Sequence, residues 1–468
     1  MRRPSIWSAF LVLLVYVPWA AAGSQPGSSL DRKFQSAVAQ YESGHFAQAA
    51  AQLEALVRQV PESFEVHELL GLVYAAQSQD AQARKHLETA VRLKPDSAAA
   101  RTNLAANLAR MGKLDLAEAE FKNAIKLEPR NFDANHNLGE LYARSGKVAD
   151  AAPLLEQAYR IDPSAYDNGY DLALAYVLTG RLTDARQLVQ DLLKKKNAAE
   201  LHNLLAEIEE KDGKFVAAAN EYEAAAHMDP SESNLFDWGS ELLIHHTLEP
   251  AIDVFRHATE RYPNSPRLLI GLGMSLYSRG NYDAAVKSLL RAADLNPSDP
   301  GAYLFLSKAY DSSPSQADEV TQHFRRFAEL QPHNPRASYY YAMSLWKGKR
   351  AQDPGLDLQQ IEALLKKAIA LDAKYAEAHL QLGNLYSDQG KYAEAIPEYV
   401  RARELDPGLG DVYYRMGQAY VHVGEKDRAQ EQFQIYQRVR AEHMAELDKQ
   451  RADIRQFVYS AKDGPSAK

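Results

Sequence analysis

Cysteine is absent from all 468 residues of the chain. Without it the protein has no disulfide bond, no iron–sulfur cluster, no cysteine-bound zinc and no lipid-modified N-terminal cysteine. Long apolar runs are also missing beyond the first 22 residues, whereas a membrane-spanning helix needs about 20 apolar residues. We therefore expect a fold that is held together by its packed core alone.

Dense basic segments are rare as well. Lys194–Lys196 is the one such run, and its place at the end of an expected helix suits the negative end of the helix dipole. The formal net charge is −8, and it becomes −10 if Arg2 and Arg3 are removed. Because nucleic-acid phosphates call for a basic face, we expect no nucleic-acid partner.

Residues 1–22 differ from the rest of the chain. Two arginines precede an uncharged apolar run, and three alanines end at Ala22. This order is typical of a secretory signal peptide cleaved near Ala22 and followed by a linker over 23–29. The alternative is an uncleaved membrane anchor, which would be the chain's membrane contact. The pattern predicts an exported protein, placed in the periplasm or otherwise secreted or envelope-associated.

Proline recurs at a fixed interval. Pro61, Pro95, Pro129 and Pro163 are separated by 34 residues each. Steps of 33 to 35 residues then lead to Asn197, Pro230, Pro263, Pro297 and Pro332, with Pro407 two repeats later. A period of this length indicates stacked helix–turn–helix units, each of which buries its apolar face against its neighbours.

The segment 376–407 shows the pattern within one unit. A small and an aromatic residue lie on the first helix, a glycine forms the turn, and a second helix ends at proline: Gly383, Tyr386, Gly390, Ala395, Tyr399, Ala402 and Pro407. Small residues at helix crossings allow close packing, and large apolar residues fill the adjoining spaces. The glycine ends the first helix, and proline separates one hairpin from the next.

This pattern closely resembles the tetratricopeptide repeat family over about residues 30–441. The resemblance implies an all-α fold, a right-handed superhelical solenoid of about twelve helix-turn-helix repeats. The expected repeats begin near residues 30, 64, 98, 132, 166, 199, 232, 266, 300, 335, 376 and 410. We expect two blocks, 30–299 and 300–441, then a capping helix over 442–460 and a flexible tail over 461–468.

Some units depart from the pattern. Asn197 replaces a proline, and Glu209 stands where other units have a large apolar residue. Irregular turns and an insertion of about seven residues fall together within 312–360. This segment is either a hinge between the two blocks or a loop without consequence for the stack.

The residues that catalysis needs are not grouped in the sequence. Pairs such as Gly112-Lys113 lack the remaining residues of a phosphate-binding loop. His245 and His246 are adjacent, so on a helix their side chains diverge by about 100°. His67 could join a metal site only with partners from elsewhere. We expect no enzyme activity, no cofactor and no metal.

Polar residues recur at one position of the first helices. Asn103 and Asn137 each lie two residues before the small residue at the helix crossing, and Asp171 takes the next such place. The family resemblance implies that this face lines a concave groove, where asparagine can pair with an extended peptide backbone. Other groups expected beside them are Arg110, Arg144 and His136. The alternative is an ordinary solvated face.

A second candidate surface is aromatic. Its members are expected to face outward from one helix and to continue onto a later one: Tyr339, Tyr340, Met343, Trp346, Tyr414 and Arg415. The buried stripe of the first helix is predicted to be Tyr341, Ala342 and Leu345. Exposed aromatic clusters are typical of binding hot spots, although packing against the insertion at 347–360 would also explain this one.

Together these features favour a non-enzymatic scaffold that binds a partner protein or an extended peptide in a concave groove. Envelope or secretion-related assembly is the setting that the family analogy suggests. The alternative is a solenoid that binds carbohydrate or another polymer in the cell envelope.

Overall fold

A computed structural model describes residues 29–312, 316–347 and 357–442. All regular structure in these ranges is α-helical. The chain separates into two compact units at Asp212. The first unit contains α1 (Ser29–Glu42), α2 (Phe46–Val57), α3 (Phe64–Ala76), α4 (Asp80–Leu93), α5 (Ala98–Arg110), α6 (Leu114–Leu127), α7 (Phe132–Arg144), α8 (Val148–Ile161), α9 (Tyr166–Leu178), α10 (Leu182–Lys195) and α11 (Ala199–Lys211).

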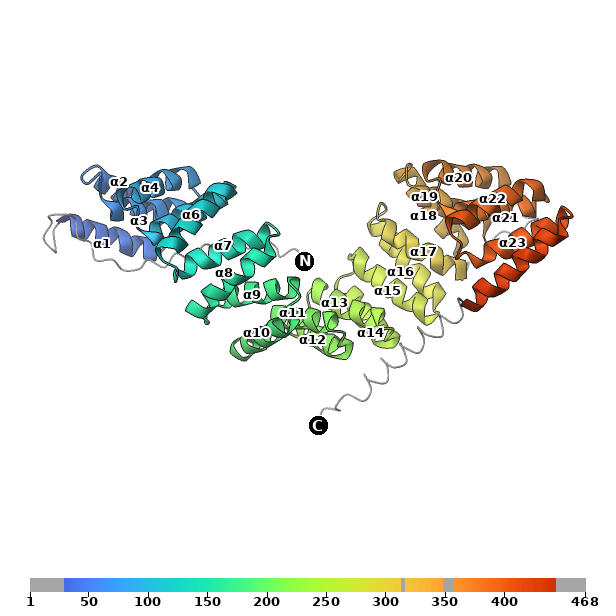
Figure 1. Cartoon of the computed structure of the whole chain (residues 1–468), viewed down its shortest axis with the longest axis horizontal. Coiled ribbons are helices and arrows are strands. Elements are labelled where there is room, and N and C mark those ends of the chain that lie inside the picture. Colours follow the sequence, from blue (N-terminus) through green and yellow to red (C-terminus); the bar gives the residue numbers. More distant parts are fainter. Residues whose placement is uncertain (1–28, 313–315, 348–356, 443–468) are drawn as a thin grey trace, which may run out of the picture. The chain divides into compact units, whose positions relative to one another are not determined.

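The second unit begins at Gly213. It contains α12 (Phe215–Met228), α13 (Glu232–Ile244), α14 (Leu248–Arg261), α15 (Pro266–Arg279), α16 (Tyr282–Leu295), α17 (Pro300–Ser312), α18 (Ala317–Leu330), α19 (Pro335–Trp346), α20 (Leu358–Leu371), α21 (Ala376–Asp388), α22 (Tyr392–Leu405) and α23 (Gly410–His422). A further helical segment covers 426–442. Figure 1 shows the helices coloured in chain order.

The predicted repeats match these helices. Each odd helix from α1 to α23 begins within one residue of a predicted repeat start, and within each unit the odd helices pack against the even helices that follow them. The all-α stack of twelve hairpins is therefore confirmed, with the second helix of the last one represented by 426–442. The predicted division at 299/300 differs from the division at Asp212 and stays a prediction.

Several predictions fall outside the described residues. These are the signal segment 1–22, residues 23–28 of the linker, the insertion at 348–356, residues 443–460 of the capping helix and the tail 461–468. Within the described part, no helix is both long enough and apolar enough to cross a membrane.

Short-range signals set where the helices begin and end. Ser97 accepts a hydrogen bond from the Ala100 backbone N–H, and Asn131 accepts one from Ala134, so each caps the N-terminus of the helix that follows. Gly112 and Gly146 have φ of 73° and 76° between the two helices of their hairpins. Glycine adopts this left-handed conformation without steric cost, so it ends the first helix and lets the chain reverse.

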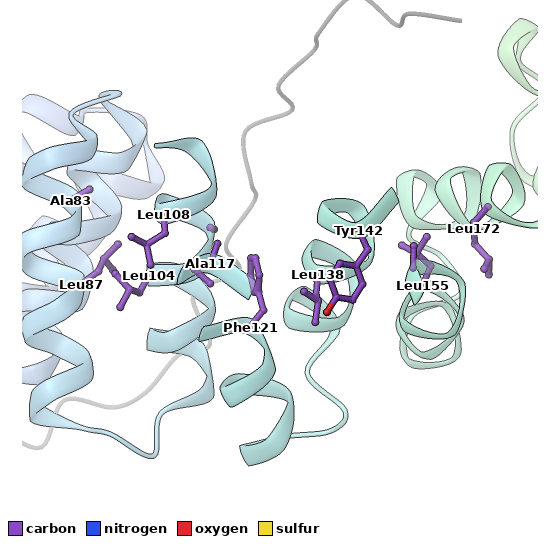
Figure 2. Packing of buried hydrophobic residues seen from close by; sticks show 14 of the residues in the cluster. Ala83, Leu87, Leu104, Leu108, Ala117, Phe121, Leu138, Tyr142, Leu155 and Leu172 are labelled. Carbon is purple, nitrogen blue, oxygen red and sulfur yellow. The ribbon is translucent and has the colours of Figure 1, made fainter. Parts of the chain in front are cut away.

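The core of the first unit runs along its whole length. Leu87, Leu104, Phe121, Leu138 and Leu155 lie in one cluster of buried side chains, and Figure 2 shows such residues following one another from α4 to α9. Each repeat therefore buries apolar surface against both neighbours, the main favourable term in the folding of such a stack.

Glycines mark the helix crossings, as predicted. A Cβ atom on Gly71 would lie 2.6 Å from Leu87 Cγ, and one on Gly139 would lie 2.8 Å from Leu155 Cγ. Since van der Waals contact between carbon atoms needs about 3.5 Å or more, only glycine fits at these points without movement of the leucine.

The odd helices lie closer to one another than the even helices do. In the first unit each odd helix contacts the next odd helix, whereas no comparable pair of even helices is in contact among α2 to α10. The side of a stack on which neighbouring elements approach is its concave side. The odd helices therefore form the concave face of this unit, as the family resemblance implies.

Hydrogen bonds join neighbouring repeats at a recurring place. A tyrosine near the end of an odd helix donates to a glutamate on the preceding even helix, at 2.9 Å for Tyr142 to Glu118 and 3.0 Å for Tyr176 to Glu156. Glu209 occupies the tyrosine's place on α11 and is bound by the Arg186 guanidinium of α10, with N···O distances of 2.6 and 3.1 Å. The departure from the repeat pattern is thus an ion pair at the same junction.

Candidate partner-binding face

The two predicted asparagines lie on the concave side of the first unit. Asn103 of α5 is 5% exposed, and its Nδ2 donates to Glu68 Oε1 of α3 across 3.4 Å. Asn137 of α7 is 9% exposed, and in the part of the chain that the structure describes its side-chain amide forms no hydrogen bond. Its amide atoms are not among the buried side-chain atoms that lack a partner, so they reach solvent and can exchange water for the hydrogen bonds of a ligand.

The predicted arginines are already paired within the chain. Arg110 Nη2 lies 2.6 Å from Asp80 Oδ1, and Arg144 Nη2 lies 2.8 Å from Glu140 Oε1. Both guanidinium groups therefore have an internal carboxylate beside them. The expectation that these arginines bind carboxylates of a partner stays a prediction. The carboxylates of the partner would have to compete with Asp80 and Glu140 for them.

His136 links two neighbouring odd helices. Its Nδ1 lies 3.0 Å from Asn168 Oδ1 of α9, and its ring stacks on Phe132 with the centroids 5.7 Å apart. Asp171 lies half-buried on the same helix as Asn168. Burial raises the pKa of Asp133, one turn before His136, and the histidine opposes that rise. The concave face at α7 and α9 is thus polar and only partly solvated.

Glu68 was not among the predicted site residues. Burial raises its pKa to about 7, while Lys94 and the hydrogen bond from Asn103 act in the opposite direction. Since its ordinary pKa is 4.5, the carboxyl is only partly ionised near neutral pH. The sequence offered one signal for this residue: Glu68 lies three residues after Glu65 on the same helix, so both carboxylates share one helix face.

The aromatic surface predicted in the second unit is mostly buried, and the predicted orientation of α19 is wrong in part. Tyr340 and Met343, predicted to face outward, are only 6% and 8% exposed. Of the predicted buried stripe, Ala342 is fully buried, whereas Tyr341 and Leu345 are only partly buried. The cause is that α19 is covered on more than one side. Tyr340 packs near Phe324 of α18, with ring centroids 5.6 Å apart.

The remaining aromatic residues of α19 also have neighbours. Tyr339 lies against Tyr375, with ring centroids 5.0 Å apart, and burial holds its pKa well above the ordinary value. Trp346 is half-buried in a cluster with Ile361 and Leu365 of α20. These side chains fill space between helices, which leaves little of them for a ligand.

Tyr414 and Arg415 lie apart from that cluster, on α23, and both are exposed. The Tyr414 ring lies 5.4 Å from that of Tyr436. Burial raises the pKa of Asp388 on α21, and Arg415 opposes the rise. On the last repeat, the predicted aromatic surface therefore consists of one exposed tyrosine beside a basic residue.

A cleft of about 570 Å³ lies between α6, α7 and α8. Its lining includes Glu118, Lys122, Tyr142 and Lys147, but none of the predicted site residues. Lys122 Nζ lies 2.6 Å from Glu118 Oε1, and both lysines lie over the Tyr142 ring. The charged groups of this cleft thus interact with one another and with Tyr142 where two repeats meet.

Histidines form no metal cluster within the described ranges, where no three ligating side chains come together. His67 lies on α3 with its Nε2 3.0 Å from the Pro61 carbonyl, so this nitrogen carries the proton. Its Nδ1 then accepts a hydrogen bond from His86 Nδ1 across 3.0 Å. The His86 ring is stacked between His67 and Tyr74.

This histidine pair predicts an acid-sensitive step in stability. Burial lowers the pKa of His86 from 6.5 to about 4, with His67 and Lys85 acting in the same direction and Glu54 against it. The unfolded chain therefore binds more protons between these pH values. The contribution of His86 should be complete above about pH 6.5 and lost progressively toward pH 4.

Urea unfolding at several pH values would measure the effect. His86→Gln should unfold with a shallower dependence on pH between 6.5 and 4 than the native protein. His45→Gln, at an exposed position of the same unit, should keep the native dependence. Equal slopes for the native protein and His86→Gln would show that His86 does not titrate abnormally.

Comparison with known proteins agrees with this geometry. Four family models described as tetratricopeptide or TPR repeats match the chain, at residues 34–98 and 102–166, 143–208, 273–311 and 383–424, and 364–396. These ranges together cover more than half of its length. The chain is a tetratricopeptide repeat protein. A repeat scaffold of this kind resembles known protein-interaction modules.

Individual relatives of this tetratricopeptide repeat protein are distant. Protein O-mannosyl-transferase TMTC3 of Homo sapiens is 24% identical over 204 residues, which are 42% of this chain and 21% of that protein. The TPR repeat-containing protein YpiA of Bacillus subtilis is 24% identical over 187 residues, 40% of this chain and 42% of that protein. The chain thus spans about a fifth to two fifths of the length of these curated relatives.

Solved structures are similar over more of the chain. The APC/C hetero-tetramer Cut9–Hcn1 is 14% identical, with a TM-score of 0.40, and the match covers 93% of this chain and 96% of that one. Naa15/Naa10 bound to HypK is 18% identical, with a TM-score of 0.37, and covers 87% and 68%.

Proposed function

We propose that this protein is a non-enzymatic scaffold that binds a partner protein or extended peptide along the odd-helix face of the first unit, the surface of α3, α5, α7, α9 and α11. The observation that carries the proposal is Asn137. The residue is nine-tenths buried on an odd helix, and its amide has no hydrogen bond from the described chain. A peptide backbone offers the donor and acceptor that such an amide lacks.

The proposal includes export, with the periplasm as the place of action and envelope or secretion-related assembly as the setting. Its support is the order of charged, apolar and small residues over 1–22. The carbohydrate-binding alternative has less support, because burial of Tyr340 and Met343 removes most of the aromatic platform on which a sugar would stack.

Crosslinking in the envelope fraction, followed by identification of the captured protein and titration with it in purified form, tests this function. Asn103→Ala/Asn137→Ala should weaken binding of the purified partner by about tenfold or more, since each lost hydrogen bond contributes about 0.5–1.5 kcal/mol. Asn123→Ala is the control, because Asn123 is exposed on α6, away from the odd-helix face.

Binding that is equal for the native protein, the double variant and the control would place the partner elsewhere and overturn this assignment. Circular dichroism and thermal unfolding of each variant would show whether the stack is intact. A variant that keeps its fold and loses only the partner supports the groove.

A further inference from the structure

Carboxylates recur at the second residue of the odd helices in the first unit. The members of this acidic column are Glu65 of α3, Asp133 of α7, Asp167 of α9 and Glu200 of α11. Consecutive odd helices are in contact, so the carboxylates of α7, α9 and α11 follow one another, whereas α5 has Ala99 at this position and separates Glu65 from them. Tyr166, next to Asp167, donates to Glu200 Oε1 across 2.8 Å, which joins the column from α9 to α11.

The charge of this face is not balanced from within. The helices α3, α5, α7 and α9 carry twice as many acidic as basic residues, whereas α4, α6, α8 and α10 carry equal numbers of each. Arg110 and Arg144, at the opposite ends of α5 and α7 from the column, are held by Asp80 and Glu140. Of the column itself, Glu200 has a cation beside it, with Lys196 Nζ at 3.4 Å. No lysine or arginine of the described chain forms an ion pair with Asp133.

Two carboxyl groups at or beside the column are partly shielded from solvent. Burial raises the pKa of both Asp133 and Glu68, which shows that neighbouring cations do not compensate for the lost hydration. Asn137, four residues after Asp133, is nine-tenths buried as a residue, and its amide has no hydrogen bond from the described chain. Removal of polar groups from water without new partners is unfavourable, so a ligand that supplies cations and backbone amides would gain free energy here.

We propose that the odd-helix face of the first unit binds an extended peptide segment rich in lysine or arginine. This inference rests on the proposed function and names the chemistry of its partner. The basic side chains pair with the acidic column, and the backbone of the segment pairs with Asn103 and Asn137. The net negative charge of the face also speeds the approach of such a segment.

The spacing of the helices predicts a pattern in the ligand. Packed helices lie about 8–10 Å apart, and an extended chain advances about 3.3 Å per residue. A segment that crosses successive odd helices therefore presents about every third residue to the next odd helix, which carries a carboxylate of the column on α7, α9 and α11. Lysine or arginine at every third position is the expected pattern, and the residues between them face the opposite side or solvent.

Fluorescence anisotropy with labelled twelve-residue peptides tests the proposal on the purified full chain. One peptide carries lysine at every third position between serine and alanine, and its analogue carries glutamate instead. Only the lysine peptide should bind with saturation, and more weakly as salt is added. Asp133→Asn/Asp167→Asn should weaken its binding by about fivefold to tenfold, since each exposed or half-buried ion pair contributes modestly.

The chain offers a matched control. Asp115 and Asp150 lie in the first turns of α6 and α8, just as Asp133 and Asp167 lie in those of α7 and α9. Asp115→Asn/Asp150→Asn therefore makes the same change in charge and in helix-dipole interaction on the even helices. It should leave the affinity for the lysine peptide at the native value.

The outcomes separate this inference from the function on which it rests. Equal weakening by both double variants, or binding of the glutamate peptide as tight as that of the lysine peptide, would overturn the basic-partner assignment. Failure of both peptides while the captured partner still depends on Asn103 and Asn137 would overturn it too, yet leave the scaffold function standing. Loss of that dependence as well would refute both.

Discussion

Replacing Phe255 with alanine should cost about 3–5 kcal/mol in the free energy of unfolding, the usual range for a fully buried phenylalanine. The side chain is 0% exposed on α14. It lies where α13, α14 and α15 come together: a Cβ on Gly239 would be 2.9 Å from its Cζ atom, and one on Gly271 would be 2.5 Å from the same atom. The absence of a side chain at two glycines, one on α13 and one on α15, thus makes room for the Phe255 ring. Urea unfolding followed by circular dichroism would measure the loss.

The complementary change is Gly271→Ala. Its methyl group would overlap the Phe255 ring, so overpacking should cost about 1–3 kcal/mol. In the double variant Phe255→Ala/Gly271→Ala, the new methyl group enters space that the ring has left. The combined loss should therefore be smaller than the sum of the two single losses, a sign of direct contact.

Gly410→Ala serves as the control for the glycine change. Gly410 begins α23, and a Cβ there would lie 3.7 Å from Val439 Cγ1, an ordinary contact. Alanine should be neutral or stabilise by up to about 1 kcal/mol, because glycine disfavours helix. Strict additivity of the Phe255 and Gly271 changes, or an equal loss from Gly410→Ala, would contradict the packing argument.

The arrangement of the helices could be predicted from the sequence because it depends on residues that recur. Glycine and alanine at the crossings, glycine at the turns and proline between hairpins are repeated many times, so one irregular unit does not hide the period. Even the replacement of a proline by Asn197 leaves the helix that follows in place, since α11 begins at Ala199. Each repeat is formed by residues that are close together in the sequence, so the residues that determine its helices and turns can be recognised from the sequence alone.

The chemistry of the concave face could be predicted less well because it depends on partners from other helices. Arg110 looked available for a ligand, yet Asp80 of the preceding hairpin lies 2.6 Å away. The position of Tyr340 on α19 predicted that its side chain is exposed, but the side chain packs against Phe324 of α18. A periodic pattern gives the direction of a side chain from its own helix. It does not say what the neighbouring helix brings to the same space.

Glu209 and Arg186 provide the second large expected effect. Glu209 is 7% exposed, and Arg186 binds both of its oxygens while also lying 2.6 Å from Asp212. Arg186→Met should destabilise the protein by about 3–5 kcal/mol, because it removes the guanidinium that binds both oxygens of a buried carboxylate. Glu209→Leu should cost less, since Arg186 keeps Asp212 as a partner.

The double variant Arg186→Met/Glu209→Leu decides between a requirement for charge and a requirement for filled space at this junction. Apolar side chains of similar volume often replace a buried ion pair without loss of stability. The double variant should therefore recover most of what Arg186→Met loses in urea unfolding. A double variant as unstable as Arg186→Met would show that the junction needs the ion pair itself.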